Sequence, residues 1–115
     1  MGIIEFPDEV DFLSFFESEP IHRDIEDALT FGYEFKQGNI CLLFYFTAYE
    51  GCVTLILKQE DTELLVLHLN NIIKIIITED EGALILRSKA GCDENNNYYV
   101  QIRPTILINN KGYAG

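Results

Sequence analysis

From residue 30 onward, apolar and polar residues alternate in short runs that are separated by turn residues. Phe31, Tyr33 and Phe35 fall on one face at a period of two, which is the period of a β-strand. The run at 40–48 is apolar at nearly every position and therefore predicts a central strand that is covered on both faces. The strands predicted in this way cover residues 30–36, 40–48, 52–58, 63–69, 72–78, 83–88, 98–103 and 105–109.

Most connections between these strands are short. A parallel pair needs a crossover of about a dozen residues, so neighbouring strands are expected to pair antiparallel in a meander. The polar stretch 89–97 is expected to form a longer loop. Pro104 stands between the last two strands and marks a bulge or an edge there, because proline cannot donate a hydrogen bond to a neighbouring strand.

Only the N-terminal third leaves room for helix. Asp8 is a suitable N-cap, and Val10, Leu13 and either Phe12 or Phe16 are then expected to face the sheet.

A second short helix is predicted after the first, with Ser18 as its cap, Pro20 near its start and its end at about Leu29. The expected fold is α+β but mainly β, with one or two short N-terminal helices packed on a six- to eight-stranded antiparallel meander. That meander forms either a curved sheet or a sandwich. The 115 residues suit a single domain spanning 1–115, and 48% hydrophobic residues suffice for an ordinary core.

Composition gives no sign of secretion or of a membrane span, since the apolar run at 72–77 is six residues long and contains Lys74. A cytoplasmic protein is therefore expected. The three cysteines are Cys41, Cys52 and Cys92, and they form no CxxC pair, which predicts reduced thiols rather than disulfides or a zinc site. No metal and no cofactor is expected.

Charge is distributed unevenly along the chain. Of the net charge of −11, residues 1–35 carry −9, because they hold ten of the 19 acids and one of the eight bases. Binding to nucleic acid or to an anionic membrane is disfavoured, since both need clustered Lys and Arg. A basic protein partner is compatible with this charge.

An enzyme is not expected. The two histidines, His22 and His68, lie in no nucleophile–base pattern, and no phosphate-binding or metalloprotease motif is present. A nucleophilic Cys92 is disfavoured, because the neighbouring Asp93 and Glu94 would raise its pKa. The acidic triplet at 79–81 lacks the spacing of a calcium-binding loop.

The acid-rich segment, residues 11–35, also holds five phenylalanines and a tyrosine. This combination of acids and aromatic residues predicts a surface that mimics a polyanion and binds a basic protein. Phe16 or Tyr33, rimmed by acids, would serve as the anchor of such a surface. A basic protein whose own site is built for phosphates is a nuclease, which is therefore the expected partner. The residues expected to bind it are Glu17, Glu19, Asp24, Glu26 and Asp27, with a second patch at Glu79, Asp80 and Glu81.

The segment "FFESEPIHRDIED" (15–27), the run of short strands and the closing "IRPTILI" (102–108) resemble the immunity proteins of bacterial polymorphic toxin systems, including contact-dependent inhibition. The resemblance implies an antitoxin-like, stoichiometric inhibitor, without catalytic activity, of one cognate toxin made in the same cell. It transfers no individual site residue.

Two alternatives stay open at this point. The apolar strands could enclose a pocket for a small molecule or a lipid, although the bulky residues in 40–77 are expected to fill that interior. The chain could instead self-associate through a sheet edge, with residues 72–77 as the adhesive strand. The oligomeric state is not specified by the sequence.

Overall fold

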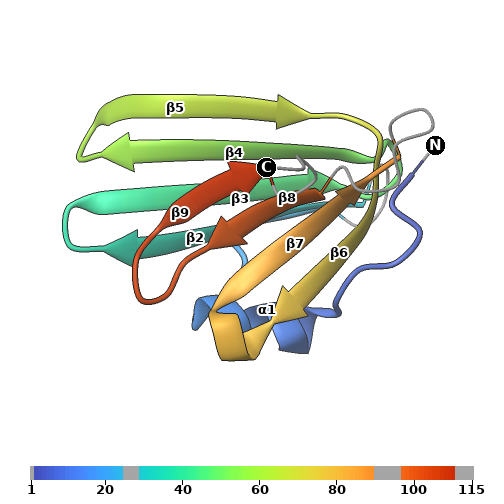
Figure 1. The fold of residues 1–115 in the computed structure, drawn as a ribbon, viewed down its shortest axis with the longest axis horizontal. Helices are drawn as coiled ribbons and strands as arrows, with labels where there is room; N and C mark the ends of the chain where they lie inside the picture. Colours follow the sequence, from blue (N-terminus) through green and yellow to red (C-terminus); the bar gives the residue numbers. More distant parts are fainter. Residues whose placement is uncertain (1, 25–28, 90–96, 111–115) are drawn as a thin grey trace.

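The computed structural model describes residues 2–24, 29–89 and 97–110, and these form two antiparallel sheets beside one helix (Figure 1). The first sheet contains, in this order, β1 (His22–Asp24), β2 (Thr30–Gln37), β3 (Ile40–Thr47), β4 (Cys52–Gln59) and β5 (Thr62–Leu69). The second contains β6 (Ile72–Thr78), β7 (Ala83–Ser88), β8 (Asn97–Gln101) and β9 (Leu107–Asn110). The helix α1 (Glu9–Phe16) precedes both sheets, and a 3₁₀ turn, η1 (Glu79–Glu81), joins β6 to β7.

The mainly β, antiparallel fold predicted from the alternation is confirmed, and so is the central position of β3, which has two neighbours on each side. The strand count is higher than predicted, because the described residues contain nine strands in two sheets rather than six to eight in one meander. The meander breaks at Asn70 and Asn71, where the chain leaves β5 and enters the second sheet. Asn71 has a φ of 60° and supports this change of direction.

The predicted second helix is wrong in its described part. Residues 22–24 form β1, which pairs antiparallel with β2 through His22↔Gly32 and Asp24↔Thr30. Residues 25–28 lie outside the described residues. A short helix with one cap gains little stability in isolation, whereas β1 gains hydrogen bonds along the free edge of β2.

Helix α1 begins as the sequence predicts. The Asp8 carboxylate accepts a hydrogen bond from the Asp11 N–H at 2.8 Å, so Asp8 is the N-cap. The buried face was predicted only in part, since Phe12 and Phe16 are buried but Val10 and Leu13 are 71% and 39% exposed. Eight residues provide one narrow inward stripe, and the larger aromatic side chains occupy it.

The two sheets and α1 share one buried cluster of apolar side chains. Within it the Phe12 ring stacks on Tyr33 with centroids 4.9 Å apart, and Phe16 stacks on the same ring at 5.1 Å. Arg103 fastens the C-terminal end of α1, because its guanidinium donates to the Phe15 carbonyl at 2.7 Å and lies 5.2 Å from the centre of the Phe15 ring. The helix is thereby held against the sheets at a defined position.

Candidate functional site

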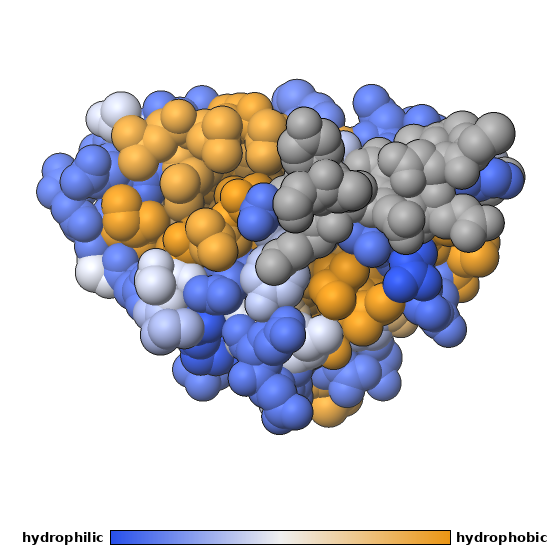
Figure 2. All heavy atoms as spheres, in the orientation of Figure 1, coloured by the Kyte–Doolittle hydropathy of each residue, from blue (hydrophilic) through white to orange (hydrophobic). Residues whose placement is uncertain are grey.

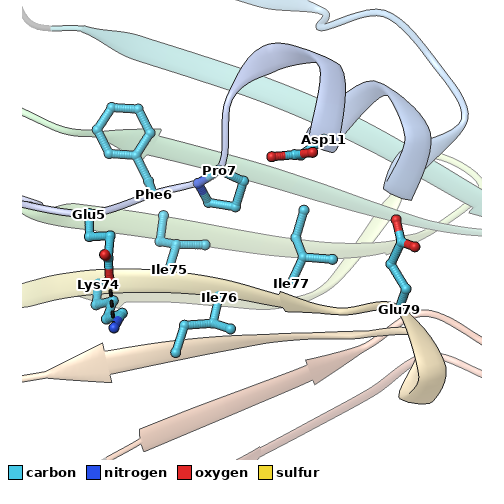
Figure 3. A pocket seen from close by; sticks show the side chains of 9 residues that line it. All are labelled: Glu5, Phe6, Pro7, Asp11, Lys74, Ile75, Ile76, Ile77 and Glu79. Atoms are coloured by element: carbon cyan, nitrogen blue, oxygen red, sulfur yellow. Dashed lines mark ion pairs between the residues drawn. The ribbon is translucent and has the colours of Figure 1, made fainter.

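An open groove of about 580 Å³ separates the start of α1 from strand β6. We call it the acidic groove. It is lined by Glu5, Phe6, Pro7, Asp11, Lys74, Ile75, Ile76, Ile77 and Glu79 (Figure 3). Figure 3 shows Asp11 and Glu79 near one end of the groove, while Glu5 is ion-paired with Lys74 at the other.

Backbone pairing explains why the acidic groove exists. Residues 3–5 run along the edge of β6, where the Ile4 N–H donates to Ile73 and the Ile75 N–H donates to the Glu5 carbonyl. Pro7 has no N–H and cannot continue this ladder, so the chain turns away into α1. The edge of β6 beyond Ile75 is therefore left at the floor of the groove.

A second, smaller concavity of about 290 Å³ lies at the C-terminal end of α1, and we call it the helix-end hollow. It is lined by Phe16, Glu17, Ser18, Glu19, Ile21, Glu34, Phe35 and Lys36. Glu17 has a φ of 58°, a left-handed conformation that ends the helix and carries the chain toward β1. Glu34 lies 3.8 Å from the Lys36 ammonium.

The predicted binding residues fall into two groups rather than one. Glu17 and Glu19 are exposed and share the helix-end hollow. Glu79 lies in the acidic groove, with Asp80 and Glu81 exposed beside it in η1. Glu17 and Glu19 follow the C-terminal end of α1, whereas Glu79 shares the acidic groove with Asp11 of the first helical turn.

The other predicted binding residues are described less fully. Asp24 lies in β1, and only its backbone is described. Glu26 and Asp27 lie outside the described residues.

Glu5, Asp11 and Glu34 were not among the binding residues predicted from the sequence, although all three line the two concavities. Glu5 and Asp11 belong to the acid-rich N-terminal third, which was the only signal for them. They line the same groove as Glu79 because residues 3–5 pair with β6, although Glu5 and its partner Lys74 are some 70 residues apart in the chain.

Much of the negative charge on this surface is not neutralised by the protein itself. Glu9 pairs with Arg23 at 2.8 Å, and Glu5 pairs with Lys74. Within residues 2–24, 29–89 and 97–110, by contrast, Glu17, Glu19, Glu79 and Asp80 have no ion-pair partner. Glu81 accepts a hydrogen bond from the Tyr99 hydroxyl at 3.0 Å and keeps its charge at the surface.

The aromatic anchor proposed from the sequence is wrong. Phe16 is 3% exposed and Tyr33 is fully buried, so neither can contact a partner. Burial, with a smaller contribution from Glu9, raises the pKa of Tyr33 to about 12. The apolar side chains that α1 does present are Val10 and Leu13, on either side of Asp11.

The described residues offer little for catalysis. His68 Nδ1 lies 3.1 Å from the Thr54 hydroxyl on the first sheet, and His22 lies in β1. Burial, followed by the hydrogen bond to Glu34, raises the pKa of the Cys41 thiol, which favours its unreactive protonated form. Cys92 lies outside the described residues.

The described residues provide neither a candidate metal-binding cluster nor a candidate membrane-spanning helix. No group of three or more His, Cys, Asp or Glu side chains in the described part of the chain is placed to hold a metal ion. No helix among the same residues has the length and apolar character needed to cross a membrane.

The alternative of a pocket for a small molecule or a lipid, enclosed by the apolar strands, receives little support from the structure. A cavity lined mainly by aromatic residues, including Phe12, Phe31 and Phe46, has a volume of about 210 Å³. Typical sites for small organic ligands occupy roughly 300–1,000 Å³. The bulky side chains of the central strands fill the core instead, as the sequence predicts.

Fold and surface together define a small, two-sheet antiparallel β protein with uncompensated carboxylates around one short helix. No family model matches the chain, and no curated protein matches it. Among solved structures, the chain is similar to one in the contact-dependent growth inhibition toxin–immunity protein complex from Klebsiella pneumoniae 342. The two chains are 26% identical with a TM-score of 0.83, over 95% of this chain and 96% of the other. The resemblance to contact-dependent inhibition proteins that the sequence indicated is thereby confirmed.

Proposed function

We propose that this chain is the immunity protein of a contact-dependent inhibition system, and that it binds and neutralises a basic cognate toxin domain in the cytoplasm. The observation that carries the proposal is the structural match over 95% of the chain to a member of a toxin–immunity protein complex. The uncompensated carboxylates are consistent with a role in binding a basic protein. The protein inhibits by occupying the toxin, without turnover.

The acidic groove and the helix-end hollow are the proposed contact surface for the toxin. A concentrated negative surface accelerates association with a basic protein and helps to orient it. Close charge pairs at such interfaces contribute about 1.5–7 kcal/mol each in measured cases. Val10 and Leu13 would supply apolar contact between the two acidic regions. A toxin whose own site binds phosphates, a nuclease, would present the Lys and Arg residues that this surface requires.

The test begins with a search of the neighbouring upstream reading frame for a basic C-terminal toxin domain, and uses that domain as the partner. Growth of cells that express this domain should be restored by co-expression of the chain. The dissociation constant is then measured by calorimetry at about 50 mM and about 500 mM salt, since screening at the higher salt weakens surface charge pairs. Wild-type affinity should fall with salt, and the toxin should cleave RNA or DNA.

Two double variants address the surface directly: Glu17→Gln with Glu19→Gln, and Asp11→Asn with Glu79→Gln. Each should weaken binding at least tenfold, because about 1.4 kcal/mol corresponds to a factor of ten. The matched control is Glu60→Gln with Asp61→Asn, which removes the same charge from the exposed turn between β4 and β5. If the control variant weakens binding equally, the acidic groove and the helix-end hollow are not the contact surface for the toxin. The proposed immunity function would be unaffected by that result. Absence of both binding and protection by the wild-type chain would refute the function.

A further inference from the structure

Strand β5 forms one edge of the first sheet, and none of the residues that the structure describes covers its outer side. The other sheet edges are protected in recognisable ways. β1 and β9 are short, at three and four residues, and residues 3–5 cover part of the edge of β6. Self-association through residues 72–77, one of the alternatives from the sequence, is therefore disfavoured. β5 is eight residues long, and no described segment pairs with its outer side.

Three successive side chains in the middle of β5 are apolar and accessible, although Thr62, Glu63 and His68 of the same strand are polar. Leu64, Leu65 and Val66 are 51%, 39% and 41% exposed. In register with β4, Leu65 lies opposite Leu57 and Val66 opposite Ile56, so successive residues of β5 present apolar groups on both faces of the sheet. Figure 2 shows hydrophobic side chains gathered over the region where Figure 1 places β4 and β5. The strand contains neither proline nor lysine, the residues that commonly prevent edge pairing.

We propose that the edge of β5 binds a second copy of this chain, so that two five-stranded sheets join into one continuous ten-stranded sheet. The two β5 strands would pair antiparallel about a two-fold axis near Leu65 and Val66. Opposite residues in an antiparallel pair share a sheet face. In one register, Leu65 lies opposite Leu65 of the second copy and Val66 lies opposite Leu64. In the other register, Leu65 lies opposite Leu67 and Val66 lies opposite Val66. Apolar groups lie opposite apolar groups at these central positions in both registers, and the adjoining pairs are Leu67 with Glu63 in the first register or Leu64 with His68 in the second.

The distribution of charge favours a second copy at this edge over the opposite edge of the same sheet, which is formed by β1. The acid-rich residues 1–35 include α1 and β1, and β1 is four strands away from β5, about 19 Å at the usual strand spacing. Residues 36–115 carry a net charge of only −2. Glu60 and Asp61 at the start of β5 would lie beside the opposite end of the other β5 strand. The acids of the two copies are thus kept apart.

This arrangement is independent of the proposed immunity function. Figure 1 places α1 and η1 on the opposite side of the molecule from β5. A pair joined at β5 therefore leaves both acidic grooves open. A single strand edge buries less than the roughly 800 Å² per partner typical of stable interfaces, so the association is weak and depends on concentration. Two copies that each carry −11 repel one another, and added salt should strengthen their association by screening.

The experiment is sedimentation equilibrium of the full chain at about 5–500 µM in about 50 mM and about 500 mM salt, which spans weak and strong screening. The mean mass should rise from 13.2 kDa toward twice that value with concentration, and the rise should be larger at high salt. Val66→Lys should shift the midpoint concentration upward at least tenfold. Leu107→Lys, which adds the same charge at a 48% exposed site on the edge strand β9, should leave it unchanged. Circular dichroism verifies that both variants fold.

Several outcomes would overturn the proposal. A chain that stays at 13.2 kDa throughout refutes it, and so does Val66→Lys associating as the wild type does. Loss of association in Leu107→Lys instead would assign the contact to β9. A monomeric wild type whose toxin affinity is lost in Val66→Lys would make β5 part of the toxin interface. Because sedimentation uses this chain alone, its result is read separately from the test of toxin binding.

Discussion

Replacing Tyr33 with phenylalanine should stabilise the protein slightly at neutral pH and remove part of its alkaline unfolding. Tyr33 is fully buried, and the rings of Phe12 and Phe16 both stack against its ring. Its hydroxyl has no hydrogen-bond partner among the described residues. A buried hydroxyl without a partner costs about 1–3 kcal/mol, so its removal from an otherwise unchanged ring should raise the free energy of unfolding by about 1 kcal/mol.

The pH dependence follows from the pKa of Tyr33, which burial raises from 10 in the free side chain to about 12. Between these values the unfolded chain releases the phenolic proton and the folded chain keeps it. The unfolded state therefore binds fewer protons, and stability falls as the pH rises above 10. The full shift corresponds to about 3 kcal/mol, and about 1.4 kcal/mol of this should be lost by about pH 11.

The assay is urea unfolding of the wild type and Tyr33→Phe at about pH 8 and about pH 11. Other tyrosines, lysines and cysteines titrate in both proteins, so the difference between the two pH dependences isolates Tyr33. That difference should be about 1.4 kcal/mol in favour of the variant. The matched control is Tyr49→Phe, at a side chain that is 74% exposed, and it should change stability by less than about 0.5 kcal/mol. Equal alkaline losses in wild type and Tyr33→Phe would refute the reasoning.

Substitutions at three further positions test the packing of α1, each measured by urea unfolding at neutral pH. Phe12→Ala should lower the unfolding free energy by about 3–5 kcal/mol, since Phe12 is 1% exposed and packs against Tyr33 and Phe46; a loss below 1 kcal/mol would contradict this packing. Asp8→Ala should cost about 1 kcal/mol through loss of the N-cap, whereas Asp8→Asn should cost much less. Arg103→Met should cost about 1–3 kcal/mol, because the Phe15 carbonyl loses its donor; a neutral result would show that this contact does not hold the helix.

Prediction from the sequence succeeded where the structure depends on local periodicity. The strand predicted at 40–48 is observed at 40–47 and the strand predicted at 83–88 is observed there, because a short apolar run bounded by turn residues marks a buried strand. The Asp8 cap was also predictable, since it depends on four consecutive residues. The resemblance to contact-dependent inhibition proteins came from size, charge and this same pattern of strands, and the structural match supports it.

Prediction failed where the result depends on contacts between distant parts of the chain. Nothing local distinguishes residues 22–24 as a strand, because β1 exists through its pairing with the edge of β2. The division into two sheets likewise depends on the change of direction at Asn70 and Asn71. The inward stripe of α1 was set by competition among Phe12, Phe16, Val10 and Leu13 for space in the core.

The contrast is clearest for the proposed binding surface. Amino-acid composition establishes that the N-terminal third is strongly acidic, and charge is a sum over residues that needs no fold. The acidic groove exists because residues 3–5 pair with β6 and place Glu5 and Asp11 along the same groove as Glu79. The exposure of β5 likewise follows from its position as an edge strand of the five-stranded sheet. Sequence patterns report what each residue prefers, whereas neighbours across a sheet are decided by long-range packing of the whole chain.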